Sequence, residues 1–202
     1  MKTQLGMKEM WKPEILNKIE NEFGYKVFQD GPYDLNIIGV RNLENNPNEF
    51  DDKLHVCYLS ESGKWKENIY QVTTDPGRYW LTKSDYKACA VYKHPQQARG
   101  AYKLGKHRGL YPALTQVQPV EYWRDGDKND KANYPINGQV HKNIIGLNIH
   151  RSSKHDSDEV NKYSAGCIVF SKMDEWDSFM DLVNKQIEHL GYHTFTFTLI
   201  AE

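Results

Sequence analysis

A cysteine and a histidine in this chain have the residue types and the surroundings of a catalytic pair. His150 lies near the end of an apolar run, and Cys167 opens another seventeen residues later, directly after Ser164, Ala165 and Gly166. A free thiol is only slightly ionised at neutral pH, and a neighbouring imidazole that accepts its proton raises the thiolate fraction. Gly166 allows a tight turn that brings main-chain N–H groups near the sulfur, where they stabilise an oxyanion. The pattern predicts a cysteine nucleophile, Cys167, that His150 activates.

The other two cysteines, Cys57 and Cys89, lie in ordinary apolar segments, and we interpret them as small core side chains. Three cysteines cannot all pair with one another and no Cys-x-x-Cys occurs, which argues against a disulfide framework and a zinc ribbon. A zinc site made of His150, His155 and Cys167 is the chemical alternative to a nucleophile. It lacks a fourth ligand and an adjacent arginine would oppose a cation, so we expect no metal and no organic cofactor.

These residues resemble the signature of a known family, the L,D-transpeptidase catalytic domain (YkuD-type). Its signature is a His-Gly, then Ser-His-Gly-Cys, and an arginine two residues after the cysteine. In this chain His150, Ser164, Gly166 and Cys167 match that signature in type, order and spacing. Upstream, residues 73–81 (TTDPGRYWL) resemble the family's Thr-Pro-x-Gly-x-Phe segment. The form is similar to divergent phage and prophage members.

The resemblance covers roughly residues 35–172. It implies a β-sandwich and a cysteine enzyme that acts on peptidoglycan stem peptides through an acyl-enzyme. Cys167 would be the nucleophile, His150 its activator and Gly166 part of the oxyanion site. Ser164 would orient His150 through its hydroxyl or its main-chain carbonyl, although a simple small-residue turn also explains it. Transfer of the acyl group to an amine would make a transpeptidase and transfer to water a hydrolase; the residues do not choose between them.

The chain departs from the family signature at three positions, which are Arg151 for glycine, Ala165 for histidine and Val169 for arginine. Because the family arginine lies close to the active site, another cation is needed for a substrate carboxylate, and Arg151 and Arg108 are the candidates. Arg108 belongs to the basic and aromatic segment 106–114, which is either a lid over the substrate or an ordinary surface loop. Tyr79 is a candidate for substrate recognition, although strands also use aromatic residues for packing.

Hydrophobic periodicity predicts the elements that position these residues. Residues 8–23 form an amphipathic helix followed by Gly24, and residues 173–190 form a second helix that Gly191 ends. Short or alternating apolar runs predict strands at 35–40, 54–59, 65–72, 78–81, 89–92, 117–123, 144–151, 167–170 and 193–199, the last with one buried face. The fold class is therefore α+β, mainly β. We expect an N-terminal helical extension, residues 1–30, and one catalytic domain, residues 31–202.

Composition limits the partners. The 202 residues carry 26 Lys and Arg against 27 Asp and Glu, a net charge of −1, so no overall basic field exists for nucleic acid or an anionic membrane. No apolar run approaches the roughly 20 residues of a membrane span. The N-terminus lacks the apolar core of a signal peptide, so we expect a chain that is cytoplasmic as synthesised and reaches the wall in a phage virion or on lysis. The alternative to an enzyme is a non-catalytic phage structural or wall-binding module that retains the fold.

Overall fold

The structure, a computed structural model, describes residues 11–44, 46, 48–83, 89–132 and 139–202. Its helices are α1 (Glu14–Asn21), α2 (Arg78–Lys83) and α3 (Met173–Leu190). Its strands are β1 (Asn36–Arg41), β2 (Asp52–Leu59), β3 (Trp65–Thr73), β4 (Ala90–Tyr92), β5 (Gln96–His107), β6 (Tyr111–Gln116), β7 (Val120–Arg124), β8 (His141–Asn143), β9 (Ile149–Arg151), β10 (Ile168–Phe170) and β11 (Thr194–Ala201). Strands dominate the described chain, which confirms the mainly-β α+β class.

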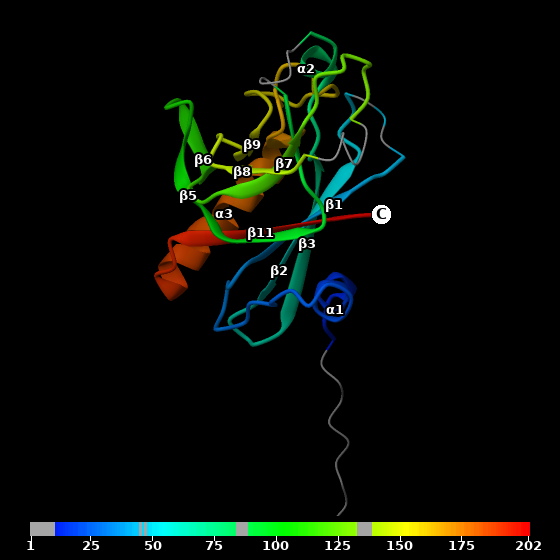
Figure 1. Cartoon of the computed structure of the whole chain (residues 1–202). Coiled ribbons are helices and arrows are strands. Elements are labelled where there is room, and N and C mark those ends of the chain that lie inside the picture. Colours follow the sequence, from blue (N-terminus) through cyan, green and yellow to red (C-terminus); the bar gives the residue numbers. More distant parts are fainter. Residues whose placement is uncertain (1–10, 45, 47, 84–88, 133–138) are drawn as a thin grey trace, which may run out of the picture.

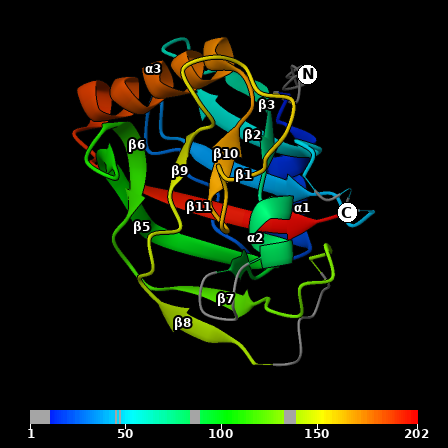
Figure 2. The same cartoon turned by 90° about the horizontal axis from the view of Figure 1, so that it is seen from above.

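Eight of the strands form a mixed sheet that is nearly closed into a ring, in the order β1-β11-β5-β6-β9-β10-β3-β2 (Figure 1). Two neighbouring pairs in the ring are parallel, β1 with β11 and β9 with β10. The other pairs are antiparallel. β4, β7 and β8 form a separate small sheet. Figure 2 shows β7 and β8 on the side of the ring opposite α3.

Helix α3 packs against the ring and contributes to its core. Its apolar side chains recur with helical spacing, and Trp176, Phe179 and Val183 are buried. The ring centroids of Trp176 and Phe179 lie 5.2 and 5.1 Å from that of Phe170 on β10. Gly191 ends the helix as predicted, in the left-handed conformation with φ +66°. This packing holds β10, the strand that follows Cys167, against the helix.

Helix α1 covers the outside of the ring and is shorter than the predicted helix at residues 8–23. It begins directly after Pro13, since proline fits only the start of a helix. Trp11, placed on its apolar face by the periodicity, precedes the helix and is 60% exposed. Residues 8–10 lie outside the described ranges. The buried side chains of α1 share one apolar cluster with the ring, which we call the α1 cluster: Ile15, Leu16, Ile19, Val27, Ile38, Cys57, Trp65 and Ile200.

Residues 78–81 were predicted as a strand and instead form helix α2. The N–H groups of Trp80 and Leu81 both bond to the Gly77 carbonyl, 2.9 and 3.2 Å away. Leu81 is buried in a small cluster with Trp123 of β7. The strand prediction was wrong because so short an apolar run fits either periodicity.

Residues 106–114 form the end of the β5–β6 hairpin rather than an irregular loop. His107 pairs there with Tyr111. The alternation of buried and exposed side chains along β5 breaks near Gly100. This glycine has a φ of +57°, and the pairing of β5 with β11 shifts register there. Exposed charged side chains further along the strand add to the irregular pattern. These features explain why the sequence shows no period of two in this region.

Of the predicted strand 144–151, only Ile149–Arg151 is a strand. The main-chain N–H groups of residues 145–147 bond to the Oε1 atom of Gln116 at 3.0 to 3.1 Å, so a side chain takes the place of a strand partner. The final strand, β11, is buried on both faces rather than one. It lies between β1 and β5, with the core of the ring on one face and the α1 cluster on the other.

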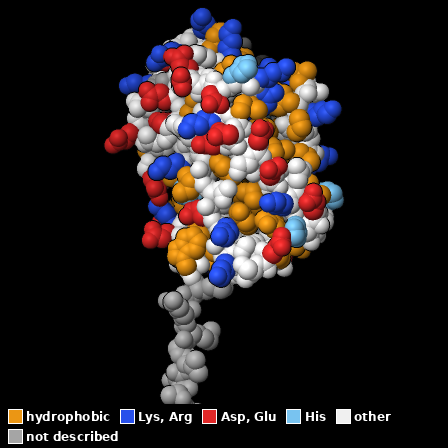
Figure 3. Space-filling view, turned by 180° about the vertical axis from the view of Figure 1, so that it is seen from behind, with side chains coloured by type: hydrophobic (Ala, Val, Ile, Leu, Met, Phe, Trp, Pro, Cys, Tyr) orange, Lys and Arg blue, Asp and Glu red, His pale blue; other side chains and the backbone are white. Residues whose placement is uncertain are grey.

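The surface matches the balanced composition. On the face shown in Figure 3, acidic and basic side chains are interspersed without a large patch of one sign. None of the helices in the described part of the chain has the length and apolar character that crossing a membrane requires.

Candidate active site

The candidate nucleophile and its partner come from neighbouring parallel strands, which lie side by side in Figure 2. β9 and β10 pair with His150 opposite Val169, and the Ile168 N–H bonds to the Asn148 carbonyl, 3.0 Å away. Side chains alternate along a strand, and opposed residues of a parallel pair point to the same face. His150 and Cys167, which are seventeen residues apart in the sequence, therefore project from one face of the ring.

The Cys167 sulfur lies between two main-chain groups of the segment that leads into β9. Its thiol donates to the Gly146 carbonyl, with 3.4 Å between Sγ and the oxygen. The Asn148 N–H donates to the sulfur. The Cys167 side chain is partly exposed, whereas Cys57 and Cys89 are buried. Cys167 is therefore the cysteine that a substrate can reach.

His150 is buried, with 2% of its surface exposed, and its two ring nitrogens have different surroundings. Nδ1 lies 2.7 Å from the Arg151 carbonyl oxygen and 3.1 Å from the Tyr111 hydroxyl. The Tyr111 hydroxyl is also within hydrogen-bond distance of the same carbonyl, at 3.2 Å. Because a carbonyl only accepts, we assign the proton of the neutral ring to Nδ1, which leaves Nε2 as the base. Nε2 is buried and finds no hydrogen-bond partner among the described residues.

A second imidazole lies against His150. The rings of His107 and His150 stack with their centroids 3.9 Å apart and 25° between their planes. The Nδ1 atom of His107 is 3.1 Å from the side-chain nitrogen of Asn148. Asn148 Oδ1 accepts in turn from the Gln116 N–H at 2.9 Å. Asn148 thus fixes the His107 ring, and His107 covers one face of His150.

Both reactive groups are held in their neutral forms. Burial lowers the pKa of His150 to about 3, and repulsion from His107 and the two nearby arginines adds to this effect. Burial also raises the pKa of the Cys167 thiol to about 11, against the opposing effects of the Asn148 N–H and the Arg108 charge. Both shifts favour a neutral thiol and a neutral imidazole over a thiolate–imidazolium pair.

Ser164 and Gly166 shape the turn before Cys167. The Ser164 hydroxyl donates to the Cys167 carbonyl, 2.8 Å away, and accepts the Gly166 N–H at 3.1 Å. Of the two alternatives that the sequence left open for Ser164, contact with His150 or a small-residue turn, the structure places its hydroxyl in the turn before Cys167. Gly166 has φ +126°, and a Cβ there would lie 2.0 Å from the Ala90 carbonyl oxygen, so only glycine fits. Because its N–H is bonded to Ser164, Gly166 does not offer that group to an oxyanion.

Two other segments hold this turn from outside. The Gly77 N–H donates to the Ser164 carbonyl at 2.9 Å, and the Ala90 N–H donates to the Ala165 carbonyl at 3.0 Å. Gly77 also approaches the chain ahead of the turn, since a Cβ there would lie 2.2 Å from the Asn161 carbonyl oxygen. The segment that contains Gly77, singled out from the sequence, therefore packs against the loop that carries Cys167.

The two arginines predicted to bind substrate differ in their surroundings. Arg108 is exposed in the turn of the β5–β6 hairpin, and its charge acts on Cys167. Arg151 lies over the Tyr111 ring, with 4.3 Å from Cζ to the ring centroid, and its Nη1 donates to the Ser153 carbonyl. Arg108 is therefore the cation that faces solvent near the sulfur, whereas Arg151 is engaged within the protein.

Tyr79, the third predicted binding residue, lies in helix α2. The ammonium groups of Lys162 and Lys83 lie 4.7 and 5.4 Å from the centroid of its ring. With the acidic stretch 156–159 it lines an open crevice. The aromatic side chain in direct contact with His150 is Tyr111 instead.

The remaining cysteines match their interpretation as core residues. The Cys57 sulfur lies 3.8 Å from the Glu67 carboxylate, which also bonds to His55 at 2.8 Å. Burial and this carboxylate raise the pKa of the Cys57 thiol far above its usual range. Cys89 is buried beside β4. Within the described ranges, no three His, Cys, Asp or Glu side chains converge as a metal site.

Sequence reasoning missed several contributors to this site. His107 and Tyr111 lie in the basic and aromatic segment, and their proximity to His150 depends on the hairpin that the sequence did not reveal. Gly146 contacts the sulfur through its main-chain carbonyl, which leaves no residue-type signal in the sequence.

The arrangement has the parts of nucleophilic catalysis: an accessible thiol, an imidazole with a base nitrogen, and main-chain groups that fix both. The residues that form the site lie in or next to the four strands β5, β6, β9 and β10.

No protein-family model, no curated protein and no solved structure matches the chain.

Proposed function

We propose that this protein is a cysteine acyl transferase or hydrolase that acts on peptidoglycan stem peptides through an acyl-enzyme on Cys167. One observation carries the proposal. His150 has a buried Nε2 without a partner among the described residues, on the face from which Cys167 projects, while its Nδ1 is held by the Arg151 carbonyl. An unpaired buried polar atom costs free energy, and a catalytic role accounts for its retention.

The substrate class rests on the resemblance to the L,D-transpeptidase catalytic domain. Residues 73–81 and the residues from His150 to Cys167 follow the order of that family's two motifs. The ring and the small sheet would then be a divergent form of the family's β-sandwich. The similarity to phage and prophage members supports the proposal that the protein reaches the cell wall in a phage virion or when the host cell lyses.

In the proposed reaction the Cys167 sulfur attacks the carbonyl carbon of the scissile peptide bond while His150 Nε2 takes the thiol proton. The tetrahedral intermediate collapses, the C–N bond breaks, and His150 gives its proton to the leaving amine. The acyl group then passes from sulfur to an amine, which makes a cross-link, or to water, which shortens the stem peptide. His150 accepts the proton of that second nucleophile and returns it to the sulfur.

Two further groups complete this scheme. The main-chain N–H of Cys167 is the donor that we assign to the oxyanion, because the Gly166 N–H is bonded to Ser164. Arg108 is the cation that we assign to a substrate carboxylate, because it is exposed and its charge reaches the sulfur.

The direct test is incubation with purified muropeptides, followed by mass spectrometry of the products. We expect products from the wild type and from Cys57→Ala, a control that removes a buried thiol, and none from Cys167→Ala. A free D-amino acid added as acceptor distinguishes the two reactions, since a transferase incorporates it and a hydrolase does not. Identical products from the wild type and Cys167→Ala would refute the proposed function.

A non-catalytic wall-binding or phage structural module is the second candidate. The neutral resting state favours it, because burial that raises the Cys167 pKa and lowers the His150 pKa opposes formation of a thiolate. Such a module would sediment with purified sacculi, leave muropeptides unchanged, and bind equally well as Cys167→Ala.

A further inference from the structure

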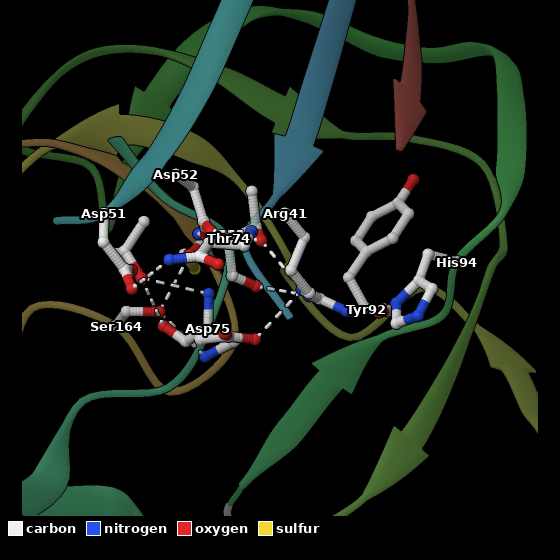
Figure 4. Close-up of polar contacts among 12 residues, drawn as sticks. Arg41, Asp51, Asp52, Thr74, Asp75, Tyr92, His94 and Ser164 are labelled. Carbon is white, nitrogen blue, oxygen red and sulfur yellow. Dashed lines mark hydrogen bonds and ion pairs between the residues drawn. The ribbon is translucent and has the colours of Figure 1, made fainter. Parts of the chain in front are cut away.

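A buried arginine bonds to two segments that also contact the turn before Cys167. Arg41, at the end of β1, is 0% exposed, and its guanidinium lies between two separate segments (Figure 4). On one side Nη1 donates to the Tyr92 carbonyl at 2.7 Å and lies 2.8 Å from His94 Nδ1. On the other side Nη2 donates to the Thr74 carbonyl at 2.7 Å and Nε to the Thr74 hydroxyl at 2.9 Å. The guanidinium thus joins β4 to the turn that follows β3.

Two carboxylates complete this network. Asp75 Oδ1 pairs with Arg41 Nε at 3.1 Å. Asp52 Oδ2 accepts from the Thr74 N–H at 2.6 Å and from the Thr74 hydroxyl at 2.7 Å, and Oδ1 accepts from the Asn42 N–H at 2.8 Å. The Thr74 hydroxyl therefore links Arg41 to Asp52. Removing one partner from a buried charge network is costly, so these contacts strongly constrain the geometry of the segments that carry them.

Both segments that the guanidinium joins also hold the cysteine turn. From the β3 side, the Gly77 N–H donates to the Ser164 carbonyl at 2.9 Å. From the β4 side, the Ala90 N–H donates to the Ala165 carbonyl at 3.0 Å. The Ser164 hydroxyl then bonds to the Cys167 carbonyl at 2.8 Å. A continuous series of hydrogen bonds and short stretches of chain therefore leads from the guanidinium to the nucleophile along two routes.

We propose that Arg41 is a positioning residue for Cys167. The buried guanidinium sets the separation of residues 73–77 from β4, and these two segments hold the turn 164–166 that presents the sulfur. This inference rests on the proposed role of Cys167 as the nucleophile. In this arrangement residues 73–77 hold the turn 164–166 in place and do not contact the substrate.

The chemistry of arginine suits this position. Its planar guanidinium directs five N–H donors outward in fixed directions, so that one side chain bridges acceptors on both sides. A lysine ammonium is a compact group with three donors at one point, and it cannot reach both the Tyr92 and the Thr74 carbonyls from the same place. Arg41→Lys therefore keeps the charge and loses the bridge.

Four variants test the proposal. Thr74→Val removes the hydroxyl that links Arg41 to Asp52 with almost no change in volume, and Thr74→Ser restores it. Arg41→Lys removes the bridge itself. Arg78→Met is the matched control, because Arg78 is an exposed arginine of α2 whose ion pair with Asp130, at 2.9 Å, lies outside the network.

Two measurements are made on each variant: the pH profile of Cys167 alkylation by iodoacetamide, and kcat and KM on muropeptides. We expect Thr74→Val and Arg41→Lys to shift the alkylation profile to higher pH, because the sulfur no longer sits at the Asn148 N–H. We expect kcat to fall about tenfold or more with KM nearly unchanged. Thr74→Ser and Arg78→Met should keep both wild-type values.

The outcomes separate this inference from the proposed function. If the wild type itself does not turn over muropeptides, the proposed function fails and the alkylation profile still decides the positioning role. If Thr74→Val folds and its Cys167 alkylation profile lies at the same pH as that of the wild type, or at lower pH, the inference is overturned. If Arg41→Lys does not fold, Thr74→Val decides. If Thr74→Val unfolds while Thr74→Ser folds, the network serves stability and the inference is overturned as well.

Discussion

Replacement of Gly77 by alanine tests how closely residues 73–77 meet the loop that carries Cys167. An ideal Cβ at Gly77 would lie 2.2 Å from the Asn161 carbonyl oxygen and 2.6 Å from its nitrogen. Real Cβ atoms essentially never approach another heavy atom within 3.0 Å. The two segments therefore have to separate by about 1 Å in a tightly packed region. Because the neighbours are main-chain atoms, no side-chain rotation relieves the overlap.

The magnitude follows from two effects. Overpacking costs about 1–3 kcal/mol. Separation also breaks the 2.9 Å bond from the Gly77 N–H to the Ser164 carbonyl, which contributes about 1 kcal/mol. Together they lower the free energy of unfolding by about 3 kcal/mol. In a protein of this size each kcal/mol corresponds to about 3 °C, so we expect Gly77→Ala to lower Tm by about 9 °C.

Thermal unfolding followed by circular dichroism measures this loss, with Gly31→Ala as the matched control. A Cβ at Gly31 would lie 2.9 Å from Leu190 Cδ2, the tip of a flexible side chain that can move away. We therefore expect the control to lose less than about 1 kcal/mol, or about 3 °C. Equal losses of Tm for Gly77→Ala and Gly31→Ala would refute the close approach of the two backbones.

Three further predictions concern the protonation of His150, the reactivity of Cys167 and the binding of substrate by Arg108. The pKa of His150 is lowered from 6.5 to about 3 on folding. As pH falls below about 6.5, the imidazole therefore takes up a proton in the unfolded chain but not in the folded one, and the free energy of unfolding decreases. Between about pH 7 and pH 5 we expect the free energy of unfolding, measured by urea denaturation, to fall by about 2 kcal/mol. His150→Gln should remove this pH dependence. Because the pKa of Cys167 is raised to about 11, its alkylation should speed up about tenfold per pH unit from about pH 7 to pH 10, whereas Cys57 should be labelled only after unfolding; mass spectrometry of the labelled peptides checks both. Arg108→Ala should raise KM for muropeptides about tenfold or more and Arg151→Ala should leave it within about twofold, and the reverse order would contradict the assignment of Arg108.

The elements with clean local patterns were predictable. The first three strands and helix α3 occur at their predicted places, since alternation or helical spacing of apolar residues reports which face is buried. The β5–β6 hairpin was missed because Gly100 and the charged positions of β5 break the period. Helix α2 was taken for a strand because a short apolar run is ambiguous. Errors therefore fell where tertiary contacts, rather than the local pattern, select the conformation.

The candidate site divides in the same way. Residue types and order in the chain were enough to single out Cys167 and His150, because thiol and imidazole chemistry belongs to the side chains themselves. Their arrangement was not readable, since it depends on the register of β9 against β10. The direction of the Ser164 hydroxyl toward Cys167 likewise depends on the shape of the turn.

The sequence by itself therefore determined the chemical inventory of this protein: one cysteine in a glycine turn, one histidine at a strand end, and a mainly-β chain of balanced charge. Only the tertiary structure decided which groups meet. It brought Tyr111 and His107 to His150 and placed Arg41 between the two segments that hold the turn. The physical reason is that periodicity records burial of neighbours along the chain, whereas hydrogen-bond partners across a ring of strands are set by pairings between distant residues.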